Sequence, residues 1–162
     1  MKILVLSDSH SSLTFMRKAI VAVKPDAVVH LGDHYDDGIA MAEEFPHLAF
    51  HIVPGNCDRY RMLRQEPEVR CYEVCGVRLF MTHGHMQSVK SSLYRLIYDA
   101  RSMEAKAALY GHTHVADCHQ NDGLWVINPG SAGYGRKTGA VIETTEGEIV
   151  NCRIIDEFDL EV

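Results

Sequence analysis

The sequence predicts an α/β fold with two β-sheets and helices packed outside them. Short apolar runs alternate with amphipathic segments along the chain, which is typical of this class. Helical segments separate the early apolar runs, as in parallel sheets, whereas two later segments read as antiparallel hairpins. The 162 residues fit one domain, 1–162, which can bury about two thirds of its unfolded surface.

The first third of the chain alternates strand and helix. An uninterrupted apolar run at 2–7 is typical of a buried strand. Apolar residues at helical spacing then predict a helix over 11–24, with Ser11 or Ser12 as its N-cap and Pro25 at its end. The elements expected next are a strand at 26–32, a helix at 38–45 and a strand at 48–55.

The remaining chain adds hairpins and one more helix. Alternating residues over 70–82, interrupted at Cys75-Gly76, predict a hairpin that turns there. A helix is expected over 88–103, from its apolar spacing. The last expected elements are strands at 105–111 and 124–130 and a hairpin at 139–155 that turns around Glu146-Gly147.

Bulk composition narrows the class of protein. The net charge of −6 argues against a chain whose main function is to bind nucleic acid. Five cysteines, an odd number without a Cys-x-x-Cys pair, are typical of reduced thiols in a cytosolic protein. The N-terminal apolar run is too short for a signal peptide, and no stretch approaches the ~18 apolar residues of a membrane span. We therefore expect a cytoplasmic protein that does not enter a membrane.

Polar side chains of the kinds that bind metals follow five of the expected strands. In open α/β sheets, ligands bind in the crevice beyond the carboxyl ends of the strands, so these side chains are expected on one rim. Glycines beside them allow the tight turns that such crowding requires. The residues are Asp8 and His10, Asp33, Asn56 and Asp58, His83 and His85, and His112 and His114.

No single motif decides the chemistry. A Gly-Asp or Gly-Asn pair is usually just a turn, and His112 and His114 alone fit a metal site or a polar strand end equally. Together, however, the carboxylates and imidazoles would crowd one another with little compensation unless a cation binds. The mixed oxygen and nitrogen donors suit Mn²⁺, Fe²⁺, Zn²⁺, Ni²⁺ or Co²⁺ better than Ca²⁺. Their number suits two ions better than one tetrahedral ion.

In this order, the motifs resemble those of the calcineurin-like metallophosphoesterases. The chain looks most similar to the small single-domain bacterial and archaeal phosphodiesterases of that superfamily. The resemblance implies a four-layer α-β-β-α sandwich of two mixed sheets with flanking helices. The matching blocks are Asp8-Ser9-His10, Gly32-Asp33, Gly55-Asn56-Cys57-Asp58, His83 and Gly111-His112-Thr113-His114.

The resemblance also implies an activity and two divalent metal ions. The activity is hydrolysis of small phosphodiesters by a metal-bound hydroxide at a dinuclear site. Mn²⁺ is the expected metal, with Ni²⁺, Zn²⁺, Fe²⁺ and Co²⁺ as alternatives. The implied ligands are Asp8, His10 and His114 for one ion, Asn56, His83 and His112 for the other, and Asp33 as the bridge.

One position departs from the wider superfamily. Cys57 stands where a histidine of that superfamily assists the leaving group, and a thiol is a poor substitute for imidazolium as an acid. His85 is either a substitute acid or a hydrogen-bond partner near the ligands, and both interpretations stay open. The catalytic candidates are Asp33, Asn56, Cys57, Asp58, His83 and His85.

A glycine-rich loop, 128–136, follows one expected strand and ends in an arginine. Backbone N–H groups of such loops can form an anion-binding nest, and a guanidinium can bind phosphate in a bidentate manner. The alternative is a sharp surface turn, which Pro129-Gly130 alone would explain. The expected phosphate contacts are Asn128, Ser131, Arg136 and Arg59.

Two other functions remain as alternatives. The first is a non-catalytic scaffold that keeps the same fold and binds protein partners. The second is a two-metal nuclease, which the acidic net charge disfavours. The expected partner is thus a small phosphodiester substrate, and a homo-oligomer is left open.

Overall fold

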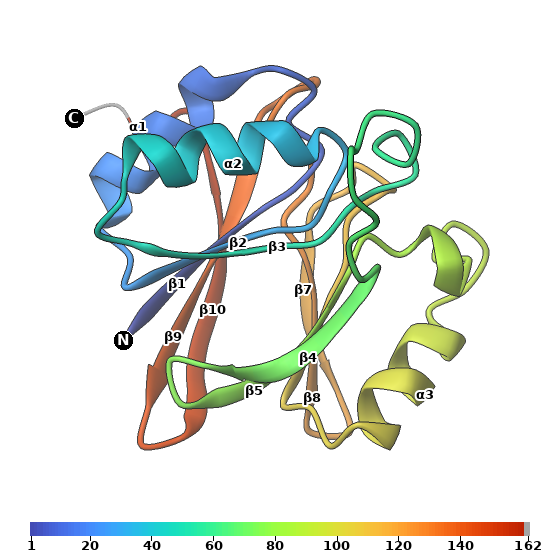
Figure 1. The fold of residues 1–162 in the computed structure, drawn as a ribbon. Coiled ribbons are helices and arrows are strands. Elements are labelled where there is room, and N and C mark those ends of the chain that lie inside the picture. Colours follow the sequence, from blue (N-terminus) through green and yellow to red (C-terminus); the bar gives the residue numbers. More distant parts are fainter. Residues whose placement is uncertain (161–162) are drawn as a thin grey trace.

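Two five-stranded sheets pack face to face in the computed structural model, which describes residues 1–160 (Figure 1). The first sheet has the order β10-β9-β1-β2-β3 and the second the order β4-β5-β6-β8-β7. The first comprises β1 (Lys2–Leu6), β2 (Ala27–His30), β3 (Ala49–Ile52), β9 (Thr138–Thr145) and β10 (Glu148–Asp156). The second comprises β4 (Val69–Val74), β5 (Val77–Thr82), β6 (Ala107–Leu109), β7 (Asp117–Asn121) and β8 (Leu124–Asn128).

Helices cover the outer face of each sheet, which confirms the four-layer α-β-β-α sandwich. The helices α1 (Leu13–Val23) and α2 (Tyr35–Glu44) lie on the first sheet, and α3 (Tyr94–Ser102) lies on the second (Figure 1). The alternation of side chains along β1 separates the layers. Ile3 and Val5 belong to the core between the sheets, whereas Leu4 belongs to the core under α1.

Parallel pairing brings six strand ends to one edge of the sandwich. β1, β2 and β3 run parallel in the first sheet, and β5, β6 and β8 run parallel in the second. The hairpin β9–β10 joins the first sheet antiparallel to β1, and β4 and β7 close the two edges of the second sheet. The carboxyl ends of β1, β2, β3, β5 and β6 carry the polar motifs, so this edge contains the candidate site.

Two expected helices have different bounds in the structure. The helix expected at 38–45 begins earlier, at Tyr35, because Asp58 accepts hydrogen bonds from the N–H groups of His34 and Tyr35 at 2.8 and 2.9 Å. The helix expected at 88–103 is wrong for its first six residues. A 3₁₀ turn at 85–87 ends at Ser88, which has a left-handed backbone (φ 53°), and hydrogen-bonded turns rather than helix occupy 88–91 before α3.

The strand β7 was not expected from the sequence. Except for Cys118, its residues, Asp117–Asn121, are polar, and the strand lies at the edge of the second sheet, where it pairs with β8. A left-handed Asp122-Gly123 turn joins the two strands. An edge strand needs no apolar alternation, so the sequence lacks the usual strand pattern here.

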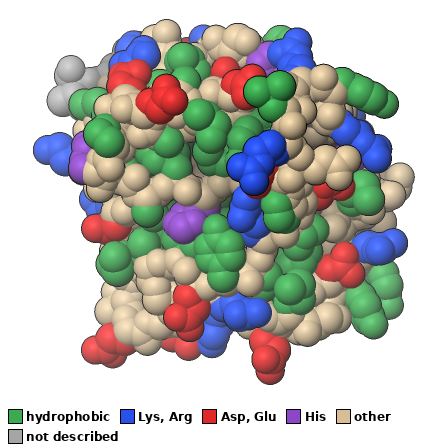
Figure 2. Space-filling model, in the orientation of Figure 1, with side chains coloured by type: hydrophobic (Ala, Val, Ile, Leu, Met, Phe, Trp, Pro, Cys, Tyr) green, Lys and Arg blue, Asp and Glu red, His purple; other side chains and the backbone are tan. Residues whose placement is uncertain are grey.

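Two features of the structure, the charge on one face and the lengths of the helices, concern nucleic-acid binding and membrane insertion. On the face shown in Figure 2, acidic and basic side chains are interspersed. No helix within residues 1–160 has both the length and the apolar character needed to cross a membrane.

A histidine at the end of β2 is completely buried. The ring of His30 is fixed at both nitrogens: Nδ1 accepts from Gly32 N–H at 3.2 Å, so Nε2 carries the proton that bonds Ser9 Oγ at 2.9 Å. Burial, only partly offset by Asp37, lowers the pKa of His30 to about 4. The folded protein therefore holds this histidine neutral at mildly acidic pH.

This burial predicts a loss of stability in acid. Unfolded His30 takes up a proton near its ordinary pKa of 6.5, whereas folded His30 does so only near a pKa of about 4. The unfolded state therefore binds more protons, and stability falls as the pH drops from about 6.5 to 4, by about 3 kcal/mol from this group. Urea denaturation of metal-free protein across this range measures the slope. The variant His30→Gln is expected to have a shallower slope, and an unchanged slope would contradict this assignment.

Candidate metal centre

Five of the candidate ligands come together in two compact groups at the shared strand edge. One group consists of Asp8, His10 and His114, and the other of Asp8, Asp33 and His83. Within each group, one ligand-type atom from every residue lies within 4.8 Å of the others. The Asp8 carboxylate belongs to both groups, so the two groups are contiguous.

The two oxygens of Asp33 face different histidines. Oδ2 lies 3.8 Å from His10 Nε2, and Oδ1 lies 3.5 Å from His83 Nε2. On the other carboxylate, Asp8 Oδ1 lies 3.1 Å from His114 Nε2 and 3.9 Å from His83 Nε2. Asp33 therefore stands between His10 of the first group and His83 of the second.

Three atoms that point into this arrangement are buried without a hydrogen-bond partner among the described residues. They are Asp8 Oδ1, His10 Nε2 and His83 Nε2. Burying such polar atoms unpaired costs stability, most of all for a carboxylate at zero exposure such as Asp8. Divalent cations in the two groups would satisfy these three atoms, and the mixture of oxygen and nitrogen donors fits transition metals. The residues present thus fit a metal ion.

Other backbone and side-chain groups orient these ligands. His83 Nδ1–H donates to the carbonyl of Leu31 at 2.7 Å, which leaves the Nε2 lone pair free for a cation. Ser7 Oγ donates to Asp8 Oδ2 at 2.6 Å, and His112 N–H donates to the same oxygen at 3.1 Å. These bonds direct the other oxygen of Asp8 toward the histidines.

Five candidate ligands have a left-handed backbone. The φ angles are 53° for Asp8, 44° for His10, 52° for Asp33, 69° for His112 and 61° for His114. Residues other than glycine rarely adopt this conformation, which costs about 1 kcal/mol or more each. Such strain is typical of functional sites, where the surrounding structure holds side chains in positions that the local sequence does not favour.

The remaining predicted ligands lie beside the compact groups. The His112 ring is centred 5.0 Å from that of His83, and Asn56 is exposed after β3 with its amide 3.7 Å from Cys57 Sγ. Burial lowers the pKa of His10, and burial with the nearby His83 lowers the pKa of His112 to about 4. Both imidazoles are therefore neutral at physiological pH, as metal binding requires.

His85 lies next to the second group but is not part of it. Its ring is centred 5.6 Å from that of His83 and 6.2 Å from that of His112. Nε2 lies 3.8 Å from Glu68 Oε1, while Nδ1 is buried with no hydrogen-bond partner within residues 1–160. This location suits either role predicted for His85.

The Cys57 backbone and thiol both stand beside Asp33. Cys57 N–H donates to Asp33 Oδ1 at 2.9 Å. Desolvation of the thiol, together with the neighbouring Asp33 carboxylate, raises the pKa of Cys57 to about 11. Without a cation beside it, Cys57 is therefore a neutral thiol at physiological pH.

Asp58, Asn128 and Ser131 are buried and bonded within the protein. Asp58 caps α2 and accepts from Gly55 N–H at 2.8 Å. Asn128 donates to Gly111 O and Thr113 Oγ1 at 3.1 and 2.9 Å, and Ser131 Oγ donates to the carbonyl of Asp8 at 2.8 Å. These bonds connect the loops that carry the ligands, and direct phosphate contact by Asn128 and Ser131 stays a prediction.

The two arginines predicted to contact phosphate differ in their surroundings. Arg136 pairs with Asp156, and its guanidinium carbon lies 5.3 Å from the centre of the Phe158 ring. Arg59 is exposed and lines a cavity of about 260 Å³ that also includes Gly55, a residue so close to the centre that a Cβ atom on it would meet Asp33 Oδ1. The cavity beside Arg59 is therefore adjacent to the candidate centre.

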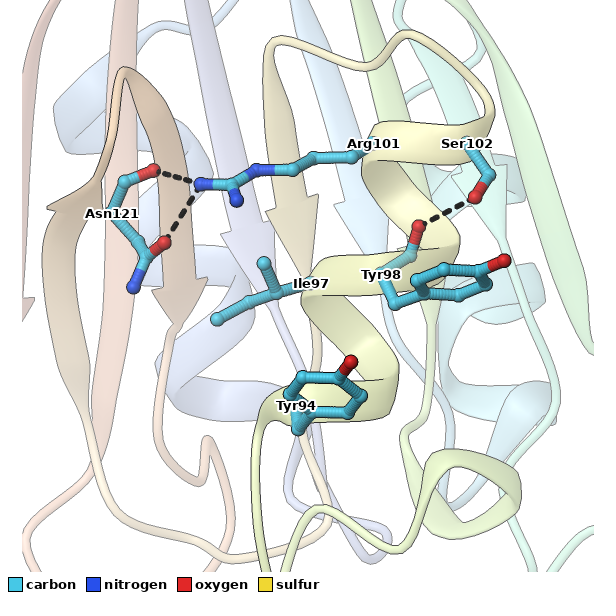
Figure 3. Close-up of a pocket in the computed structure, with 6 residues that line it drawn as sticks. All are labelled: Tyr94, Ile97, Tyr98, Arg101, Ser102 and Asn121. Atoms are coloured by element: carbon cyan, nitrogen blue, oxygen red, sulfur yellow. Dashed lines mark hydrogen bonds between the residues drawn. The ribbon is translucent and has the colours of Figure 1, made fainter.

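The larger cavity, about 570 Å³, lies elsewhere, along α3 (Figure 3). Arg101 reaches across it and donates to the backbone and side-chain oxygens of Asn121, both at 2.7 Å. None of the candidate ligands lines it. Its lining residues are Tyr94, Ile97, Tyr98, Arg101, Ser102 and Asn121.

Sequence reasoning missed three contributors to the site. Ser7 orients Asp8, Leu31 orients His83 through its carbonyl, and Tyr134 packs against two ligand rings. The Tyr134 ring is centred 4.6 Å from that of His10 and 5.7 Å from that of His114, nearly parallel to the latter. The proximity of Ser7 to Asp8 was visible in the sequence, but the other two contacts depend on the tertiary fold.

Known proteins are similar to this chain over nearly its whole length. The model of the calcineurin-like phosphoesterase superfamily domain matches residues 1–147. A phosphodiesterase of Methanocaldococcus jannaschii is 31% identical, with 91% of this chain and 96% of the relative covered. The probable metallophosphoesterase YsnB of Bacillus subtilis is 29% identical, with 100% of this chain and 95% of the relative covered.

A solved structure supports the same relationship. The crystal structure of a conserved Streptococcus pneumoniae protein, described as a predicted phosphoesterase, superposes with a TM-score of 0.74 at 25% identity. The superposition covers 96% of this chain and 97% of the S. pneumoniae chain. The sequence match, the two mixed sheets and the clustered ligand-type side chains agree, and the chain belongs to the calcineurin-like phosphoesterase superfamily.

Proposed function

We propose that this protein is a metal-dependent phosphodiesterase that hydrolyses small phosphate diesters at a dinuclear centre. The observation that carries the proposal is the position of Asp33, whose two oxygens face His10 on one side and His83 on the other. A carboxylate in this position is suited to bridge two cations. The similarity to a phosphodiesterase of M. jannaschii supports the choice of diesters over monoesters.

The two ions would have different ligands. Asp8, His10 and His114 would hold the first, and His83, His112 and Asn56 the second, with Asp33 between them. Mn²⁺ is the proposed metal, as the resemblance to the superfamily implies, and the mixed oxygen and nitrogen donors also accept Ni²⁺, Zn²⁺, Fe²⁺ or Co²⁺. Bound divalent ions supply Lewis acidity, which lowers the pKa of water and stabilises negative charge on phosphoryl oxygens.

The residues of the chain would contribute orientation and substrate access. Asp8 and His83 are held by Ser7 and the Leu31 carbonyl, so their cation-facing atoms need little rearrangement. His114 is partly exposed, which leaves that side of the centre open to a small ester. Cys57 lies beside Asp33, and its thiol is a poorer acid for a departing alkoxide than an imidazolium would be.

Removing the proposed bridge, Asp33, or a completely buried ligand, His83, tests the dinuclear centre. Asp33→Asn and His83→Ala are expected to lower kcat/KM for bis(p-nitrophenyl) phosphate with Mn²⁺ by more than about 100-fold, the upper loss typical of residues that only support ligands. Asp36→Asn, an exposed acid on α2, serves as the matched control and should retain activity. Metal-replete wild-type protein that hydrolyses neither diesters nor monoesters would refute the proposed activity.

Replacing the thiol tests how the leaving group is protonated. Cys57→His is expected to accelerate hydrolysis of diesters with basic alkoxide leaving groups by at least about 10-fold, since a positioned acid contributes about 10²–10⁴-fold. Hydrolysis of p-nitrophenyl esters should change little, because that leaving group needs no proton. The rates of a series of aryl and alkyl esters measure the difference, with Cys57→Ser as the control. An equal change for all leaving groups would argue against this role of position 57.

The two arginines provide a test of substrate contact. Arg59→Gln is expected to raise KM by about 10-fold, the order of one charge-assisted hydrogen bond. Arg136→Gln should leave KM nearly unchanged, since Arg136 is paired with Asp156. Steady-state kinetics with the same diester compares them, and the reverse order would transfer the phosphate contact to the loop at 128–136.

A further inference from the structure

The turn that carries two of the candidate ligands has an unfavourable backbone. In the segment Asp8–Ser11, here called the ligand turn, Asp8, His10 and Ser11 have φ angles of 53°, 44° and 70°. Three left-handed residues out of four make this a strained turn, and such a turn persists only when surrounding contacts hold it in place. The contacts around this turn therefore decide where His10 lies.

A buried carboxylate from another element contacts the ligand turn at two points. Asp37, in the first turn of α2, is only 8% exposed. Its Oδ2 accepts hydrogen bonds from Ser11 N–H and from Ser9 Oγ, each at 2.7 Å. These two donors flank His10 in the chain, so Asp37 binds the ligand turn on both sides of that candidate ligand.

The hydrogen bonds beneath the turn form a directed chain. Gly32 N–H donates to His30 Nδ1, His30 Nε2–H donates to Ser9 Oγ, and Ser9 O–H donates to Asp37. Each donor in the chain has an acceptor, so His30 and Ser9 can occupy only one arrangement. Ser9 is completely buried and its proton is committed to Asp37, so it is no candidate nucleophile.

Capping of α2 alone does not explain Asp37. Asp36 is also acidic, lies in the same first turn and is exposed, so it interacts with the helix dipole without being desolvated. Burial of Asp37 costs free energy that only specific bonds to the charged group offset. Its two bonds lead to the ligand turn rather than to α2.

We propose that Asp37 is a positioning residue that, through Ser9 and His30, fixes the ligand turn and thereby sets the affinity of the His10 side of the centre for a divalent cation. The inference rests on the proposed function, because it requires the metal centre. It concerns residues that contact neither the cation nor the substrate directly.

Calorimetric titration of metal-free protein with Mn²⁺ tests the proposal without any substrate. Asp37→Ala is expected to weaken one of the two binding steps by about 10–100-fold and leave the other within about threefold, as for other residues that orient metal ligands. Asp36→Ala is the matched control, since it removes the same charge from the same helix turn, and both of its steps should stay within about threefold.

Two further variants separate positioning from a general loss of stability. Asp37→Asn keeps an oxygen that can accept both bonds, so it should retain the affinity of the wild type. Ser9→Ala breaks the hydrogen-bond chain without changing a residue of α2. It should reproduce part of the loss of Mn²⁺ affinity even if Asp37→Ala fails to fold. In a His10→Ala background, Asp37→Ala should have no further effect on the remaining step, because the coupled site is already absent.

The outcomes distinguish this inference from the proposed function. Wild-type protein that binds two Mn²⁺ ions but hydrolyses no ester refutes the activity, and the loss in Asp37→Ala still supports positioning. Folded Asp37→Ala with both binding steps unchanged, or Asp37→Asn as weak as Asp37→Ala, overturns the inference while the activity stands. Wild-type protein that binds no Mn²⁺ overturns both.

Discussion

Two carboxylates and an imidazole buried at the junction of the sheets are the constraint on which the rest of this structure depends. Asp8, Asp33 and His83 are 0, 4 and 0% exposed, and they lie within reach of one another. Two carboxylates so close together repel, and the inward-facing Asp8 Oδ1 and His83 Nε2 have no hydrogen-bond partner in the described part of the chain. Bound cations would offset this repulsion and satisfy the unpaired atoms, which agrees with the two candidate metal-binding groups.

The loops around these three side chains are packed so closely that one added carbon atom would collide with its neighbours. A Cβ at Gly111 would lie 2.1 Å from Ser7 Oγ and 2.7 Å from Asp8 Oδ2. A Cβ at Gly55 would lie 2.2 Å from Asp33 Oδ1. Neither glycine is needed for a left-handed backbone; each allows a neighbouring loop to approach a carboxylate. The left-handed strain falls instead on the aspartates and histidines themselves, so crowding and strain are distributed between different residues.

The sequence was sufficient for most of the elements and for the edge on which the candidate site lies, but not for β7 or for the start of α3. Apolar runs such as Ile3–Leu6 are separated by a single residue from an Asp or His, and parallel strands bring those ends together whatever the details of the loops. Long-range polar contacts were not predictable. The early start of α2 depends on Asp58, which is 23 residues from Tyr35 in the chain, and the edge strand β7 has no apolar pattern. Similarly, nothing around Asn128 in the sequence indicates that its amide would bond Gly111 and Thr113.

The sequence spacing of His112 and His114 does not show whether the two side chains face one metal position or two, and the fold decides between these arrangements. In an extended chain, residues two apart face the same side and would chelate one ion together. Here both have left-handed backbones, and their rings diverge: His114 lies 3.1 Å from Asp8 Oδ1, whereas His112 faces the His83 ring at 5.0 Å. The backbone N–H of His112 also bonds Asp8, so one short loop contacts both groups. The left-handed backbone of this loop therefore directs the two candidate ligands toward two different positions.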